Sequence, residues 1–230
     1  MKRFKAWFQS PIHIMMPLVL AVVLVMGTLA YFTDVEAAVN TIRFGEVSIE
    51  TNEKLEGIEK HNIGVTAQGT SDCFVRIRVD VPTVRYTYSD ENGIVVTKQA
   101  KVVLLDGTTL SADEWLTYSE TIEVQMNGVD YIWEKNPDDG FWYLNRQLSR
   151  GEQVPFIDKI TYEDLYVVEN GTRVLADGIT EDMLSIPIIS EAVQADNLVE
   201  DLKAEGKTGY DLAVVAFQRV ADGYTGTSGN

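Results

Sequence analysis

The sequence has few of the residues on which enzyme sites commonly depend. It contains one cysteine, Cys73, and two histidines, His13 and His61, in 230 residues. A zinc peptidase usually carries His-Glu-x-x-His on a helix, and the chain has no such motif. The Gly-x-Ser-x-Gly elbow, the phosphate-binding loop and the Gly-x-Gly-x-x-Gly fingerprint are also absent from the sequence. We therefore predict a protein that is not an enzyme and has no catalytic residues.

The single cysteine also excludes a disulfide within the chain. An exported domain would then have to be stabilised by packing alone. Cys73 begins an apolar alternation, and we interpret it as a small buried side chain rather than a nucleophile.

Basic residues are scarce as well. The chain has 19 Lys and Arg against 35 Asp and Glu, a formal net charge of −16. Outside the first five residues no Lys/Arg cluster exists to neutralise phosphates. The composition thus excludes nucleic acid as a favoured partner. Anionic lipid would repel the body of the protein for the same reason.

The N-terminus has the pattern of a secretory signal. Lys2, Arg3 and Lys5 precede an apolar run, and the small residues Thr28 and Ala30 fit a cleavage site before Tyr31. We predict a signal peptide over residues 1–30. The alternative is an uncleaved membrane anchor, because residues 14–32 carry no charge. In either case the body is delivered outside the cell, with membrane contact only through the N-terminal segment.

Cleavage would increase the acidity of the chain. Residues 1–30 hold three of the 19 basic residues and no acidic ones, so 16 basic residues would face 35 acidic ones, a formal net charge of −19. Copies of such a protein repel one another at low salt. Divalent cations or a specific interlocking contact would have to offset that repulsion during assembly.

Beyond Tyr31 the dominant period is two, which is typical of strands. Cys73, Val75, Ile77, Val79 and Val81 share one face, with Arg76, Arg78 and Asp80 on the other, so we predict a half-buried strand that ends at Pro82. Asn127-Gly128 and Asn170-Gly171 predict two-residue hairpin turns, and residues 136–140 a further turn. Residues 186–195 predict a late strand.

Helices are expected to be few and short. Ser111 and Glu114 have capping-box spacing, Gly206 would end a helix that starts near Leu198, and Asp211 would cap a last helix that Gly223 ends. Many short strands separated by turns predict one all-β domain, a β-sandwich over residues 31–223 with a few peripheral helices. Residues 224–230 read as a flexible tail.

Two places could bind a ligand. The acidic pair Asp138 and Asp139 lies in the turn over residues 136–140, and clustered carboxylates suit Ca²⁺, although solvated turn residues are the simpler interpretation. Trp142 could stack a sugar. Alternation places Phe141 and Tyr143 on one face of their strand and Trp142 on the other, so at least one side must be core. Beyond calcium we predict no cofactor.

Several segments resemble the TasA and camelysin family of exported Gram-positive proteins. The resemblance begins in the stretch GTLAYFTDVEAAVNTIRFGEVSIE and continues in IGVTAQGTSDCFVRIRVDVP, DDGFWYLNRQLSRGEQVPFIDKI and ISEAVQADNL. At the family's Asn position this chain has Ala67-Gln68, and it carries an insertion around residues 101–115. The resemblance implies a jelly-roll-like sandwich preceded by a signal segment that a dedicated signal peptidase removes.

The same resemblance implies a structural protein of the biofilm matrix or cell surface. In such fibres the N-terminal segment of one subunit completes the sheet of the next, which makes further copies or related matrix subunits the partners. The corresponding assembly residues in this chain are Tyr31, Phe32, Thr33, Asp34, Val35, Asn40, Phe44, Val47 and Ile49. An extended end released by cleavage could supply backbone hydrogen bonds to an open sheet edge. Alternatively, Val47 and Ile49 form the first strand of their own sandwich.

We therefore expect a secreted, non-enzymatic fibre subunit or accessory component. The alternatives are a carbohydrate-binding surface module that uses Trp142 or its neighbours, and a metallopeptidase of the camelysin type.

Overall fold

The computed structural model describes residues 39–43, 49–56, 58–195 and 198–223, with the backbone alone for 39–43 and 52–56. The contacts divide the chain into the units Met1–Ala37 and Ala38–Asn230, and only the second contains described residues. The predicted signal peptide, its cleavage residues Thr28, Ala30 and Tyr31, and the predicted tail lie outside them. In the part of the chain that is described, no helix is long and apolar enough to cross a membrane.

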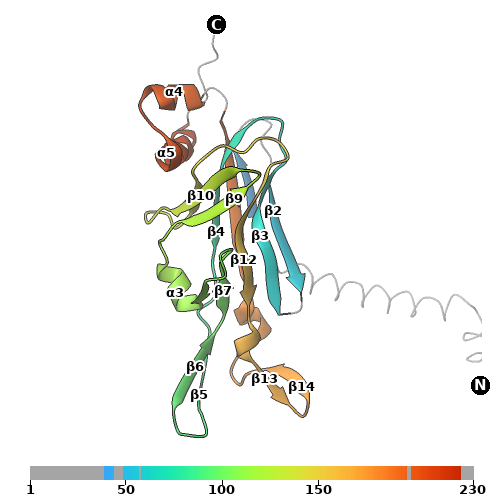
Figure 1. Ribbon diagram of the computed structural model, residues 1–230. Coiled ribbons are helices and arrows are strands. Elements are labelled where there is room, and N and C mark those ends of the chain that lie inside the picture. Colours follow the sequence, from blue (N-terminus) through green and yellow to red (C-terminus); the bar gives the residue numbers. More distant parts are fainter. Residues whose placement is uncertain (1–38, 44–48, 57, 196–197, 224–230) are drawn as a thin grey trace, which may run out of the picture. The chain divides into compact units, whose positions relative to one another are not determined.

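Most strands belong to two sheets that pack face to face (Figure 1). One sheet has the order β1-β15-β4-β11-β10-β9, with bounds Val39–Arg43, Ile188–Gln194, Cys73–Val79, Trp142–Leu144, Val129–Lys135 and Ile122–Met126. The other has the order β2-β3-β12-β7-β8, with bounds Ile49–Glu56, Glu59–Ala67, Gln153–Thr161, Lys101–Val103 and Thr109–Ser111. The prediction of a mainly β, sandwich-like fold with a few short helices is thus confirmed.

Two further hairpins and two short 3₁₀ turns complete the described strands and turns. The hairpins are β5–β6 (Arg85–Ser89 and Val95–Gln99) and β13–β14 (Tyr166–Glu169 and Thr172–Leu175). The 3₁₀ turns span Glu163–Leu165 and Glu181–Leu184. Paired strands are antiparallel throughout the described residues, with one exception: β1 runs parallel to β15.

The alternation of β4 places its apolar residues in the core as predicted. Cys73, Val75, Ile77, Val79 and Val81 are all buried, and they belong to the cluster that both sheets share. Burial of each large apolar side chain contributes about 1.5–3 kcal/mol. The interior between the sheets is therefore the main source of stability.

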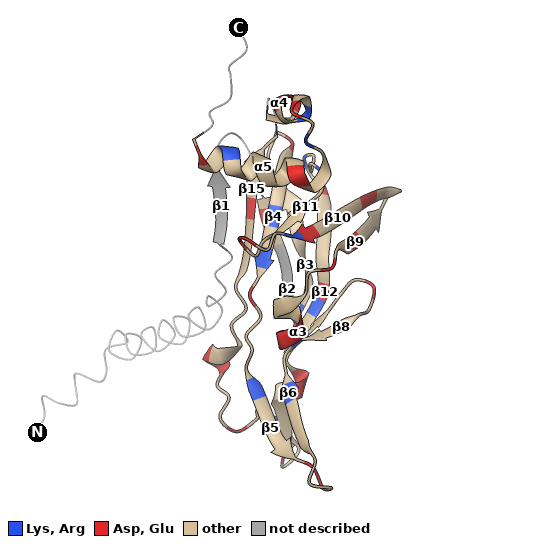
Figure 2. Cartoon of the chain, turned by 90° about the vertical axis from the view of Figure 1, so that its left-hand side faces the viewer, with Lys and Arg blue, Asp and Glu red and all other residues tan. Residues whose placement is uncertain are grey.

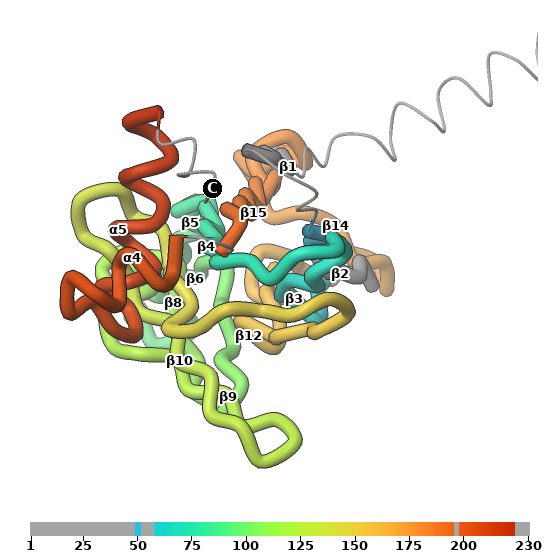
Figure 3. Tube along the Cα trace, turned by 90° about the horizontal axis from the view of Figure 1, so that it is seen from above, coloured from blue at the N-terminus to red at the C-terminus, as the bar shows by residue number. Residues whose placement is uncertain are grey.

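Only part of the opposite face of β4 is open to solvent. The prediction of a half-buried strand holds at Arg78, whose side chain is 36% exposed, but was wrong at Phe74 and Arg76. Helices α4 (Leu198–Ala204) and α5 (Gly209–Ala221) cover this face of the sheet, on the side away from β2 and β3 (Figure 3). Phe74 is fully buried beneath them, in a second apolar cluster. Arg76 lies in the same row of β4 side chains, so a charged group is enclosed there.

Two local predictions from the sequence were confirmed, one hairpin turn and one helix cap. Asn127 and Gly128 adopt positive φ angles of 53° and 75° between β9 and β10. Helix α3 (Ala112–Thr117) begins with a complete capping box between Ser111 and Glu114. The N-cap prediction for Asp211 was wrong, because α5 begins at Gly209 and Thr208 is its N-cap.

Candidate functional site

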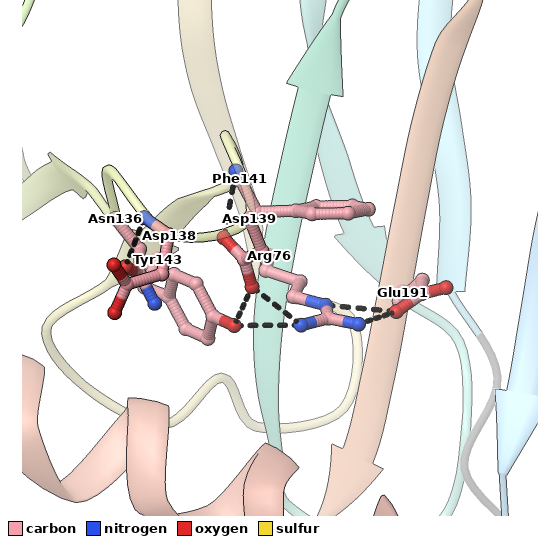
Figure 4. A network of polar contacts seen from close by, with 7 residues as sticks. All are labelled: Arg76, Asn136, Asp138, Asp139, Phe141, Tyr143 and Glu191. Atoms are coloured by element: carbon pink, nitrogen blue, oxygen red, sulfur yellow. Dashed lines mark hydrogen bonds and ion pairs between the residues drawn. The ribbon is translucent and has the colours of Figure 1, made fainter.

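Arg76, on β4, is the centre of a polar network beneath α5 (Figure 4). Its Nε donates to Glu191 Oε2 at 2.8 Å, and its Nη2 pairs with the same oxygen. Its Nη1 donates to Asp139 at 3.0 Å and to the Tyr143 hydroxyl at 2.6 Å. The register brings these groups together, since Arg76 faces Glu191 on β15 and Tyr143 on β11.

Aromatic rings enclose the guanidinium. Its central carbon lies 4.2 Å from the ring centre of Phe141 and 4.5 Å from that of Phe217 on α5. Burial alone would lower the pKa of Arg76, but the hydrogen bonds to Glu191 and Tyr143 outweigh it and raise that pKa. Burial, together with the hydrogen bond to Asp139, raises the pKa of Tyr143 to about 12. The network therefore stays charged on Arg76 and protonated on Tyr143 at neutral pH.

A cavity of about 200 Å³ adjoins this network, with Asp138 and Asp139 in its lining. Asp139 accepts hydrogen bonds from Arg76, from the Tyr143 hydroxyl and from the backbone N–H of Phe141. A calcium ion would have to compete with the guanidinium for this carboxylate. The described residues contain no group of three or more His, Cys, Asp or Glu side chains that could hold a metal. The calcium site stays a prediction.

Cys73 and His61, which were considered as nucleophile and metal ligand, lie apart from the Arg76 network. Cys73 is 1% exposed, and burial raises its thiol pKa to about 12. A neutral buried thiol is a poor nucleophile, which agrees with the structural interpretation of this residue. His61 lies on β3, where its Nε2 is 3.0 Å from Glu59, and Glu59 also pairs with Lys159 at 2.8 Å. This arrangement is a partly exposed ion pair between Glu59 and Lys159, with the His61 ring in contact with the carboxylate, on the five-stranded sheet.

Trp142 is a core residue. It is 1% exposed and stacks on Trp115 and Tyr118, with ring centres 5.6 and 5.9 Å away. A sugar would find no open face on this ring. Phe141 and Tyr143 point to the other side as predicted, yet they too are buried, at 7% and 1% exposure. Both faces of β11 are therefore internal.

The predicted assembly segment is described only in part. Asn40 lies in β1 opposite Ser190, and Ile49 begins β2 opposite Ala67 in the sandwich of its own chain. The remaining predicted residues lie outside the described ones: Tyr31, Phe32, Thr33, Asp34, Val35, Phe44 and Val47. Residues 39–43 form the edge strand of the six-stranded sheet. The first strand of the described residues thus lies at an edge of its sheet.

Sequence reasoning did not single out Arg76, Glu191 or Tyr143. One signal was available, because Arg76 interrupts an apolar stretch between Val75 and Ile77. Its partners come from residues 63 to 115 positions away and could not be assigned without the register.

The comparisons with protein-family models, curated proteins and solved structures gave no significant match for this chain.

Proposed function

We propose that the protein is a secreted, non-enzymatic structural component of the cell surface or biofilm matrix. It would assemble by exchange of its N-terminal strand after removal of residues 1–30. The sandwich would have jelly-roll topology, and the partner would be another copy or a related subunit. The resemblance to the TasA and camelysin family, the acidic composition and the position of β1 support this proposal.

The observation that carries the proposal is the pairing of β1. This five-residue strand lies at the edge of the six-stranded sheet and runs parallel to β15, with Val39 opposite Ile189 and Arg43 opposite Val193. Parallel pairing is slightly weaker per residue than antiparallel pairing. An edge strand contacts one neighbour in its sheet and can leave without separating two others.

Exchange would cost little free energy. Each backbone hydrogen bond contributes about 0.5–1.5 kcal/mol net, and the same residues of a second copy restore every bond that the first copy gives up. The balance then depends on protein concentration. It also depends on the repulsion between copies, which each carry a formal net charge of −16, or −19 after removal of residues 1–30. Salt screens this repulsion and should therefore favour assembly.

Mixing two variants that each carry one added cysteine tests the proposal directly. The chain from Tyr31 would carry Val39→Cys in one sample and Ile189→Cys in the other. These residues are register partners, and neighbouring strands lie about 4.8 Å apart, within reach of a disulfide. Cys73 can stay, because its buried thiol with a pKa of about 12 is unreactive.

Exchange should give a disulfide-linked dimer in the oxidised mixture that reducing agent removes. Val39→Cys mixed with Thr97→Cys, on the exposed β5–β6 hairpin, measures random collision. A double variant that closes only within its own chain, together with a mixture no more reactive than this control, would refute strand exchange. The peptidase alternative instead requires chelator-sensitive cleavage of casein by the purified protein.

A further inference from the structure

A groove of about 680 Å³ lies between α3 and the end of β4, and we name it the α3 groove. It exists because β11 is short: Trp142 pairs with Ile77, and the turn over residues 136–140 then leads the chain away, while β4 continues to Val79. Small-molecule sites usually have volumes of about 300–1,000 Å³. The side chains that matter here are Arg78, Asp80, Thr117, Tyr118, Ser119 and Lys135.

The groove is not built to accept a peptide strand. Trp115 on α3 covers the edge of β4 beyond its pairing with β11, and its indole N–H donates to the carbonyl of Val79 at 3.0 Å. A strand added there would have to displace a tryptophan that is 4% exposed. What the groove offers a ligand is therefore mainly side-chain donors, hydroxyls and rings.

Lys135 supplies an ammonium group to the groove, and its Nζ lies 5.7 Å from the ring centre of Trp142. Its Nζ donates to the carbonyls of Leu116 and Tyr118, at 3.1 and 3.0 Å, which leaves one of three N–H groups for a ligand. Among the described residues it forms an ion pair with no carboxylate. In a chain with 35 acidic residues, such a cation favours an anionic ligand from outside.

Arg78 adds a second cation at the same groove. Its Nε bonds to Asp80 at 3.3 Å, so its two Nη groups can form a fork toward a carboxylate. The Arg78 side chain is 36% exposed and the Asp80 side chain 49% exposed, so both heads reach solvent. An adjacent acid and base of this kind can also bond to hydroxyl groups.

Tyr118 provides a fixed ring beside these charges. It is half-buried and stacks on Trp115 and Trp142, with interplanar angles of 15° and 28°. Exposed Thr117 and Ser119 flank it. A pyranose ring presents a flat C–H face that packs on an aromatic ring, and hydroxyls that bond to polar groups around it. The groove combines both kinds of contact.

We propose that the α3 groove binds an acidic oligosaccharide, with a uronate carboxylate on Lys135 and Arg78 and a pyranose face against Tyr118. This site is independent of strand exchange. It assigns the carbohydrate contact to Tyr118 and the two cations rather than to the buried Trp142.

The test is a titration of the chain from Tyr31, which contains the whole unit Ala38–Asn230, with oligogalacturonate. Binding would be followed by calorimetry at low and moderate salt, with a neutral malto-oligosaccharide and poly-glutamate as comparison ligands. Oligogalacturonate should bind more weakly as salt rises, and both comparison ligands should bind at least tenfold more weakly.

Lys135→Gln and Arg78→Gln should each lower the affinity about tenfold or more, and Lys135→Arg should retain most of it. Tyr118→Leu should lower it, whereas Lys159→Gln, on the other sheet, should not. Unchanged circular dichroism and melting temperature exclude unfolding as the cause. Absence of oligogalacturonate binding, or binding that Lys135→Gln leaves unaltered, overturns the proposal. Equal binding of poly-glutamate would assign the groove to acidic peptides and overturn it as well.

Discussion

Replacement of Arg76 by alanine should be among the most destabilising single changes on the helix-covered face of the sandwich. The substitution leaves Glu191 and Asp139 without their shared cation and removes the contacts with Phe141 and Phe217. Removing one partner of a buried ion pair costs about 3–5 kcal/mol. The Arg76 and Glu191 side chains keep 18% and 16% exposure, so water can partly solvate the orphaned carboxylate. We therefore expect a loss of about 3 kcal/mol in the free energy of unfolding.

Urea unfolding followed by tryptophan fluorescence measures this loss. Arg78→Ala is the matched control on the same strand, because its ion pair with Asp80 is 36% and 49% exposed and should contribute about 0–1 kcal/mol. In the Arg76→Ala background, Glu191→Gln should restore part of the stability, because it removes the unpaired charge. If Arg76→Ala and Arg78→Ala differ by less than about 1 kcal/mol, or the effects of the two substitutions at Arg76 and Glu191 simply add, the network does not act as described.

Three further predictions concern other parts of the fold. Gly64→Ala should cost about 2–3 kcal/mol in the same urea assay, because a Cβ there would lie 2.5 Å from the carbonyl oxygen of Val154 on β12; a loss below about 0.5 kcal/mol contradicts this. Cys73, with its pKa raised to about 12 by burial, should react with a thiol reagent at pH 8 only after unfolding in urea, and rapid labelling of the native chain would show that it is accessible. The hydrogen bond from Lys159 lowers the pKa of Glu59 below its ordinary 4.5, so the pair stabilises the fold above pH 4.5 and less as pH falls through the folded-state pKa. Glu59→Gln should cost under about 1 kcal/mol at pH 7 and nothing at low pH, and an equal loss at both pH values would exclude the ion pair as its cause.

The parts of the fold that the sequence predicted depend on short-range chemistry. The alternation from Cys73 to Val81 identified the core face of β4, because side chains of a strand point to opposite faces in turn. Asn127-Gly128 identified a hairpin, since both residues tolerate positive φ. Ser111 and Glu114 identified the start of α3 through hydrogen bonds within one turn.

The parts that could not be predicted depend on contacts between distant segments. Nothing local to Phe74 says that helices from residues 198–221 will cover it. Trp142 looked able to stack a sugar because its sequence neighbours are aromatic, but Trp115 and Tyr118 from the α3 region enclose it. Lys135 and Arg78 line one groove only because β11 is short. Basic residues are otherwise scattered among acidic ones on the described strands and helices (Figure 2).

The parallel edge strand has a consequence for the order of events in the life of the molecule. Val39 pairs with Ile189, about 150 positions further along the chain. Because a polypeptide is made from its N-terminus, β1, the first of the described strands, must wait until β15, the last of them, has emerged. Closing so long a loop is slow compared with forming the hairpins that lie between β1 and β15 in the chain. Each new molecule therefore passes through an interval in which β1 has no partner, and the edge of β15 stays open until β1 docks on it.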